Sequence, residues 1–205
     1  MKRSDRQAVT LIELLIASTL LLLLTTLVFG YLIPATKAAN KARIKSHLQQ
    51  SATVVLAKIK QASATTSPGG VSWSMTDMVG LGFNPVEELQ ASNGLLKWSD
   101  SYTLFWWNEA EQKLWFADWK GETAEESSVV RAKRLPPDRL RTVFTDEPPL
   151  RKVMAQGVTE FSIQQGGSDV ALVQPITVNL ELVQPDLTDS PVVSRSVTFR
   201  VVNQQ

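Results

Sequence analysis

The carboxylate of Glu13 is the side chain in this sequence whose position most clearly demands a chemical partner. It lies four residues after Val9, and the apolar stretch continues from Leu14 to Thr36 with no further charged side chain. A carboxylate in a membrane helix costs about 2.5–3.5 kcal/mol at mid-depth and less near the interface. No basic residue lies inside the segment, so we expect the partner to come from outside it. An α-amino group would be available if the chain were cut just before Val9; the alternative is that Glu13 extends to the lipid headgroups.

The residue types on which most enzymes and metal sites depend are scarce. The 205 residues include no cysteine and one histidine, His47, which excludes a Cys nucleophile, a Cys-ligated metal and a multi-His metal site within one chain. No Walker loop, dinucleotide fingerprint, G-x-S-x-G or HExxH sequence is present. We interpret the acidic pairs Glu87-Glu88 and Glu125-Glu126 as surface charges. We therefore expect no enzymatic activity, no cofactor and no metal.

The charge balance and composition limit the class of protein further. With 21 basic and 20 acidic side chains the net charge is +1, which argues against a dedicated nucleic-acid binder. Hydrophobic residues make up 43% of the chain, which is typical of a globular protein. A basic cluster follows the apolar stretch, and we interpret it as a solvated face or a contact with lipid headgroups. Its members are Lys37, Lys41, Arg43 and Lys45.

The 23 uncharged residues from Leu14 to Thr36 are long enough to cross a membrane as a helix. They would span about 35 Å, and the hydrocarbon core of a bilayer is about 30 Å thick. A cleaved secretory signal has a shorter apolar core, and a core helix of a soluble protein is amphipathic rather than apolar all round. A plain signal anchor fits the length but does not explain Glu13.

The sequence from Ala8 to Ala17, AVTLIELLIA, follows a short segment that carries Lys2, Arg3 and Arg6. It resembles the N-terminal signature of type IV pilins and type II secretion pseudopilins. In that family a basic leader ends at a small residue, and a hydrophobic residue, Thr-Leu-Ile-Glu-Leu and an apolar helix follow. Ala8 stands where the family usually has Gly, and Val9 where it usually has Phe or Met.

The resemblance implies a leader of residues 1–8, cut between Ala8 and Val9 by a prepilin peptidase that also methylates the new N-terminus at Val9. It implies that Glu13 meets the N-terminal amine of a neighbouring subunit during assembly. Residues beside Glu13 in the signature would share this contact: Thr10, Leu11, Ile12 and Leu14. The implied partners are other pilin or pseudopilin subunits, the peptidase, the inner-membrane assembly platform and membrane lipid.

The resemblance also implies a location, a bacterial inner membrane crossed once over residues 9–36. The N-terminus would be cytoplasmic and the head periplasmic, and the subunit would move from the membrane into a filament. Basic residues flank the apolar stretch on both sides, so the distribution of charge does not by itself fix this orientation.

The helix is expected to continue beyond the membrane as an amphipathic half, residues 37–66, that enters the head. An apolar stripe at helical spacing predicts this half: Ile44, Leu48, Val55, Ile59 and Ala62. Gly30 and Pro34 interrupt the middle of the helix. Because Pro lacks a backbone donor and clashes with the preceding turn, we expect a kink or local melting there. Ser67-Pro68-Gly69-Gly70 is expected to end the helix.

Residues 67–205 are expected to form a β-rich head, which gives an α+β fold with the long helix packed on a mostly antiparallel sheet. Residues 101–108 and 113–119 alternate like the arms of a β-hairpin. Further strands are expected at 158–165, 176–183 and 194–202, and segment 122–149 is expected to be a loop with a short helical piece. We interpret Trp98, Trp115 and Trp119 as core beneath the sheet, with a carbohydrate or partner surface as the alternative.

The tract from Val153 to Phe161 contains Gly157-Val158, two residues and then Phe161. It resembles the segment that opens the second sheet in J-type minor pseudopilins and related minor pilins. With a head of about 140 residues, this favours a pilin-like minor subunit of a type II secretion or type IV pilus filament, acting in assembly or at the tip. The alternative function is a signal-anchored extracytoplasmic binding domain with a Trp-rich ligand surface.

Overall fold

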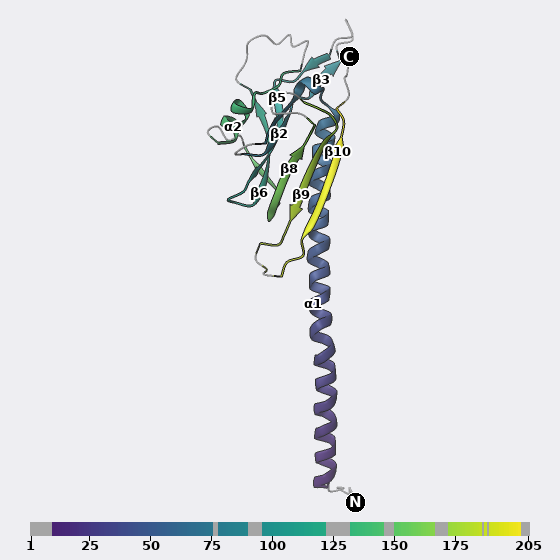
Figure 1. Ribbon diagram of the computed structural model, residues 1–205. Coiled ribbons are helices and arrows are strands. Elements are labelled where there is room, and N and C mark those ends of the chain that lie inside the picture. Colours follow the sequence, from purple (N-terminus) through teal and green to yellow (C-terminus); the bar gives the residue numbers. More distant parts are fainter. Residues whose placement is uncertain are drawn as a thin grey trace, which may run out of the picture. The chain divides into compact units, whose positions relative to one another are not determined.

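The computed structural model describes residues 10–75, 78–89, 96–121, 132–145, 150–166, 172–185, 187 and 189–201. Contacts divide the chain into two compact units, Met1–Arg43 and Ile44–Gln205, and the helix α1 (Leu11–Ala64) belongs to both. The described part of the first unit is almost wholly helix. The second unit contains the rest of α1 and all the described strands (Figure 1). The chain is therefore α+β, as the sequence predicts.

The part of α1 that follows Ile44 is amphipathic and closes the main core of the head. All members of the predicted stripe are buried or partly buried there: Ile44, Leu48, Val55, Ile59 and Ala62. Ala52 and Leu56 are buried too and widen the stripe. The helix ends at Ala64, and the predicted breaker cluster forms the short 3-10 helix η1 (Pro68–Gly70).

The larger sheet has five antiparallel strands in the order β1-β2-β5-β6-β7. Their bounds are β1 Val71–Ser74, β2 Gly80–Phe83, β5 Ser101–Asn108, β6 Lys113–Lys120 and β7 Lys152–Gln156. The predicted hairpin is confirmed as β5 and β6, which pair along their whole length from Ser101↔Lys120 to Asn108↔Lys113. Long cross-strand pairing of this kind fixes the register of the sheet centre.

The second sheet has three antiparallel strands in the order β10-β9-β8: β8 Val158–Gln164, β9 Ile176–Leu182 and β10 Val193–Phe199. They confirm the three further predicted strands to within a few residues, although residue 202 lies outside the described residues. Val158 begins β8 directly after Gly157, as expected of a segment that opens a second sheet. A separate small hairpin pairs β3 (Val86–Leu89) with β4 (Leu96–Trp98).

The two faces of the β5–β6 hairpin belong to two different hydrophobic cores. Phe105 and Phe116 lie in the main core with α1 and the three-stranded sheet. Trp106 lies in a second core that α2 (Pro137–Thr145) closes, and its ring stacks on that of Phe144 with centroids 4.9 Å apart. The helix α2 is the short helical piece expected within 122–149; residues 122–131 and 146–149 of that segment lie outside the described residues.

Gly157 joins the two sheets, because it lies between the end of β7 and the start of β8. Its φ is +70°, a left-handed conformation that strains any residue with a Cβ, and an added Cβ would overlap the carbonyl oxygen of Val183. We expect Gly157→Ala to lower the free energy of unfolding of the head by about 2–4 kcal/mol. Urea unfolding of the full chain in detergent micelles, followed by near-UV circular dichroism, measures this change.

Gly69→Ala is the matched control for Gly157→Ala. A Cβ at Gly69 would meet its nearest atom at 3.7 Å, which is an ordinary contact, and the φ of this residue is not left-handed. We expect the control to change the free energy of unfolding by less than about 0.5 kcal/mol. Equal stability of the two variants would contradict the prediction.

Candidate functional site

The N-terminus of α1 brings Thr10 and Glu13 into direct contact. The Glu13 Oε2 atom accepts a hydrogen bond from the Thr10 backbone N–H at 2.9 Å and another from the Thr10 hydroxyl at 3.0 Å. The Glu13 backbone N–H donates in return to Thr10 Oγ1 at 3.4 Å. This reciprocal arrangement is a capping box, which satisfies backbone donors that the first turn of a helix otherwise leaves unpaired.

The capping box gives Glu13 neutral hydrogen-bond partners inside its own segment, and a cation from outside the segment stays a prediction. The sequence signal was a Thr followed three residues later by a Glu, directly before an apolar run. Both Thr10 groups are electrically neutral, so they orient the carboxylate without compensating its charge. The site therefore holds a fixed carboxylate whose charge can still attract a cation.

The other predicted contact residues surround this carboxylate with exposed apolar surface. Leu11, Ile12 and Leu14 are 88%, 67% and 64% exposed. Other described residues bury only a small part of these three side chains. Their apolar area is therefore available to lipid or to another helix. Ala8 and Val9, the predicted sites of cleavage and methylation, lie outside the described residues.

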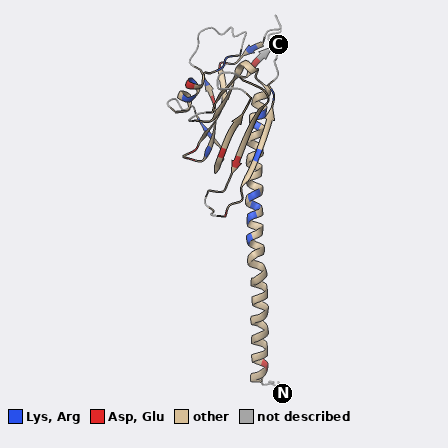
Figure 2. Cartoon of the chain, in the orientation of Figure 1, with Lys and Arg blue, Asp and Glu red and all other residues tan. Residues whose placement is uncertain are grey.

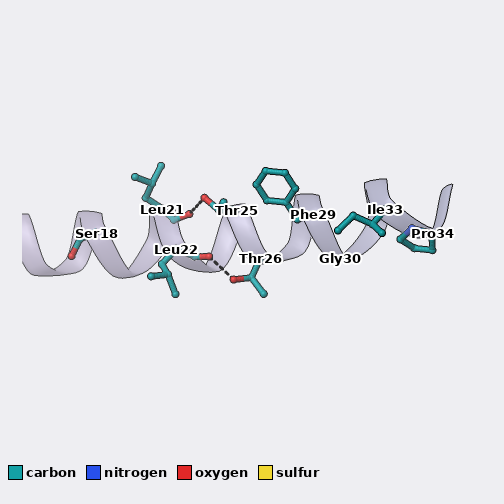
Figure 3. A pocket seen from close by; sticks show the side chains of 9 residues that line it. All are labelled: Ser18, Leu21, Leu22, Thr25, Thr26, Phe29, Gly30, Ile33 and Pro34. Atoms are coloured by element: carbon teal, nitrogen blue, oxygen red, sulfur yellow. Dashed lines mark hydrogen bonds between the residues drawn. The ribbon is translucent and has the colours of Figure 1, made fainter. Parts of the chain in front are cut away.

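Beyond Glu13 the helix exposes apolar side chains on all sides. In the described part of the chain, α1 is the one helix long and apolar enough to cross a membrane, as a single span or a signal anchor. Its hydroxyl groups bond to its own backbone: Thr25 Oγ1 donates to the Leu21 carbonyl at 2.6 Å and Thr26 Oγ1 to that of Leu22 at 2.7 Å (Figure 3). Polar groups satisfied in this way can enter hydrocarbon without a large penalty.

Gly30 and Pro34 lie on the same exposed helix face as Ser18, Leu22 and Thr26 (Figure 3). This face is the surface of a single helix and encloses no cavity. The helix α1 continues without interruption through Gly30 and Pro34, so local melting is not observed. A bend at Pro34 stays a prediction.

The basic cluster that follows the apolar stretch lies on the solvent-facing surface of α1. Lys37, Lys41, Arg43 and Lys45 are all exposed, and Figure 2 shows blue Lys and Arg positions gathered in the middle of the helix ribbon. The preceding part of α1 is almost entirely uncharged in the same view. His47 is exposed as well. The change from apolar to basic surface along one helix fits a passage from hydrocarbon to headgroups.

The tryptophans of the head are mostly core residues. Trp73, Trp98, Trp106, Trp115 and Trp119 are each at most 9% exposed. Trp107 is half-buried, and its Nε1–H donates to the Val158 carbonyl at 3.1 Å, which ties the hairpin to the second sheet. The burial supports the interpretation of these rings as core beneath the sheet.

The described residues contain no group of three or more His, Cys, Asp or Glu side chains placed to hold a metal ion. Two acidic pairs were interpreted as surface charge. Glu87 of the first is exposed and bonds to Lys97 at 3.0 Å, while the second pair, Glu125-Glu126, lies outside the described residues. The geometry of the described chain thus points to the N-terminal helix, rather than to a pocket in the head, as the candidate functional site. Comparisons with protein-family models, with curated proteins and with solved structures give no match to this chain.

Proposed function

We propose that this chain is a minor pilin-like or pseudopilin subunit that acts in the assembly of a type II secretion or type IV pilus filament, or at its tip. The observation that carries the proposal is the capped carboxylate of Glu13 at the start of an exposed apolar helix, within the sequence Thr-Leu-Ile-Glu-Leu. The head is a pilin-like domain in this proposal, and its function is structural rather than catalytic.

The charge of Glu13 supports an assembly function because it is oriented but uncompensated within the capping box. The amine that would follow cleavage before Val9 is the matching cation, and in a low-dielectric environment such a pair is strongly attractive. A contact of this kind between two subunits would favour one register of the packed helices over others. The attraction between the Glu13 carboxylate and the amine is strong only where the pair is partly buried. Exposed apolar neighbours such as Leu11 and Leu14 would bury it between two packed subunits.

The exposed apolar face of α1 supports packing against other subunits within the membrane and later in a filament. Its side chains are close to half exposed or more from Leu11 to Ile33, so nothing in the described chain covers them. The proposed partners are other pilin or pseudopilin subunits, a prepilin peptidase, the inner-membrane assembly platform and lipid. The proposed location is a bacterial inner membrane, with the N-terminus cytoplasmic and the head periplasmic.

The N-terminus of the protein from native membranes tests the proposal directly. We expect intact mass and N-terminal sequencing to find a chain that begins at N-methylated Val9, because Ala8 is the small residue before the apolar segment. A chain that still begins at Met1 would contradict processing and favour the signal-anchored binding domain instead.

An exchange of the membrane segment separates the two functions further. We expect replacement of residues 9–36 by an unrelated transmembrane helix to keep the head folded and membrane-attached but to abolish incorporation into a filament. Full function of this chimera would contradict an assembly role for the helix and favour the anchored binding domain.

A further inference from the structure

The five-stranded sheet ends in an edge strand, β7, that is open to solvent. Among the described residues, β7 is hydrogen-bonded on one side only, to β6. Its other side presents a line of backbone N–H and C=O groups, which is a template for a further strand. Lys152, Val153 and Gln156 are exposed, whereas β1, at the opposite edge of the same sheet, is buried along its whole length. The two edges of this sheet are therefore not equivalent.

Apolar side chains at the start of β7 face the solvent. Leu150 is 97% exposed and Val153 is 39% exposed. Val153 is the Cα partner of Trp115 on β6, so these two side chains share the face that carries the second core. Charged side chains such as Lys152 protect an edge strand from pairing with a second copy of itself, because like charges repel. Apolar area exposed beside an unpaired edge leaves that edge able to accept a further strand.

Cations lie on both faces of this edge. The Arg151 guanidinium is 4.2 Å from the centroid of the Trp115 ring, on the outer face. Lys152, the next residue, is the Cα partner of Phe116 and so lies on the opposite face, where Lys58 Nζ is 3.6 Å from the Phe116 ring. Within the described residues, no carboxylate forms an ion pair with any of these three cations. Among the described residues, Arg151 and Lys152 thus give this edge exposed cations on both faces, and Asp118 is the acid that lines the same hollow as Lys58.

We propose that β7 is a docking edge for an extended acidic segment of a partner protein, which adds to the sheet as a strand. Backbone hydrogen bonds to β7 would supply the general affinity, and side chains would supply the selectivity. Adjacent residues of a strand point to opposite faces. Two neighbouring carboxylates would thus meet Arg151 and Lys152, and an apolar side chain at the next position would cover Val153. This site belongs to the head and does not rest on the function proposed for the helix.

Synthetic peptides test the docking edge with the full chain in detergent micelles. The probe is a labelled, blocked nonapeptide with two adjacent Glu residues flanked by alternating Val and Thr, and fluorescence anisotropy measures its binding. We expect a counterpart with Lys in place of Glu, and an acidic one with a central Pro, to bind at least about tenfold more weakly. Binding that is equal for the acidic peptide and its Pro-containing version would overturn strand addition.

Charge reversal in the protein supplies the matched variants. We expect Arg151→Glu combined with Lys152→Glu to weaken binding of the acidic peptide at least about tenfold and to reverse the preference toward the Lys peptide. Arg195→Glu is the control, because Arg195 is an exposed cation on β10, another edge strand, and we expect no change. Equal losses in the control and the double variant would show general electrostatic attraction and overturn the proposal.

Hydrogen exchange locates the bound peptide. We expect unpaired backbone amides within residues 152–156 to exchange at least about tenfold more slowly when the acidic peptide is bound. Protection elsewhere without protection of β7, or no binding of the acidic peptide at about 1 mM, would refute the docking edge.

Discussion

Glu13→Ala is expected to leave the chain inserted in the membrane and to reduce its incorporation into a filament at least about tenfold. Insertion should not suffer, because the change removes a carboxylate that costs about 2.5–3.5 kcal/mol at mid-depth in a bilayer. Assembly should suffer because loss of one partner of a desolvated charge pair costs about 2–5 kcal/mol. Loss of the cap adds only about 1 kcal/mol.

Two further variants separate the charge of Glu13 from its capping interaction. Glu13→Gln keeps an oxygen that can accept from the Thr10 N–H but has no charge, and we expect it to be impaired nearly as strongly as Glu13→Ala. Thr10→Val removes the hydroxyl that bonds to Glu13 Oε2 but keeps the carboxylate. We expect Thr10→Val to fray the first turn of α1 and to assemble much closer to the unchanged chain.

The measurement is the ratio of assembled to membrane-bound subunit in native cells that lack the unchanged protein. Immunoblots of sheared filaments and of membrane fractions give the two amounts for each variant. Normal incorporation of Glu13→Gln would show that the charge is not needed. Failure of Thr10→Val as severe as that of Glu13→Ala would assign the function to the cap instead of the charge.

The parts of the fold that follow from the sequence are those in which one periodic pattern decides the burial. The spacing of Ile44, Leu48, Val55 and Ile59 places them on one helix face whatever they pack against, and the structure buries that face. The alternation in residues 101–108 similarly predicts one arm of a hairpin, and the structure buries side chains on both of its faces. In both cases local periodicity and tertiary burial agree, which is why the prediction succeeds.

Strands β1, β2, β3, β4 and β7 were not predicted, and β2 shows one physical reason. Its sequence, Gly80-Leu81-Gly82-Phe83, has two glycines, which weaken a strand by their conformational freedom. In the folded chain, neighbouring side chains lie too close to both glycines to leave room for a Cβ. A Cβ on Gly80 would lie 2.5 Å from Phe144 Cε2, and one on Gly82 would lie 3.0 Å from Leu104 Cδ2. The close contacts that explain these glycines come from α2 for Gly80 and from β5 for Gly82. Both elements lie far along the chain, so no local pattern reveals the contacts.

The capping box of the candidate site could be predicted from a local sequence pattern, but the source of the cation partner of Glu13 could not. Thr-x-x-Glu predicts the capping box, because that interaction is local. The lone carboxylate predicts a cation from outside the segment, but only the family resemblance places that cation in another subunit. The polar contacts of Asn84 are another long-range case: its Nδ2 donates to the Ser99 carbonyl at 2.6 Å and its Oδ1 accepts from the Lys133 N–H at 3.2 Å.

Trp106→Ala is expected to lower the free energy of unfolding of the head by about 3–5 kcal/mol. Trp106 is 1% exposed and stacks on Phe144 at an interplanar angle of 13°, so its removal leaves a cavity beneath α2. Because Leu140 and Val143 lie in the same core, we expect α2 to lose its packing before the main core does. Urea unfolding followed by near-UV circular dichroism gives the free energy, and hydrogen exchange in residues 137–145 reports on α2.

Trp107→Phe is the matched control, because it changes the neighbouring indole on the opposite face. It removes the hydrogen bond to the Val158 carbonyl but keeps an aromatic ring, and we expect a loss of about 1 kcal/mol. If Trp106→Ala were no more destabilising than Trp107→Phe, the second core would not hold the Trp106 ring firmly. The rings of the hairpin would then be available to a ligand. This result would favour the anchored binding domain over the filament subunit as the function of the chain. A large loss confined to Trp106→Ala instead assigns these rings to stability, which favours the exposed apolar surface of the N-terminal helix over the tryptophans as the functional surface.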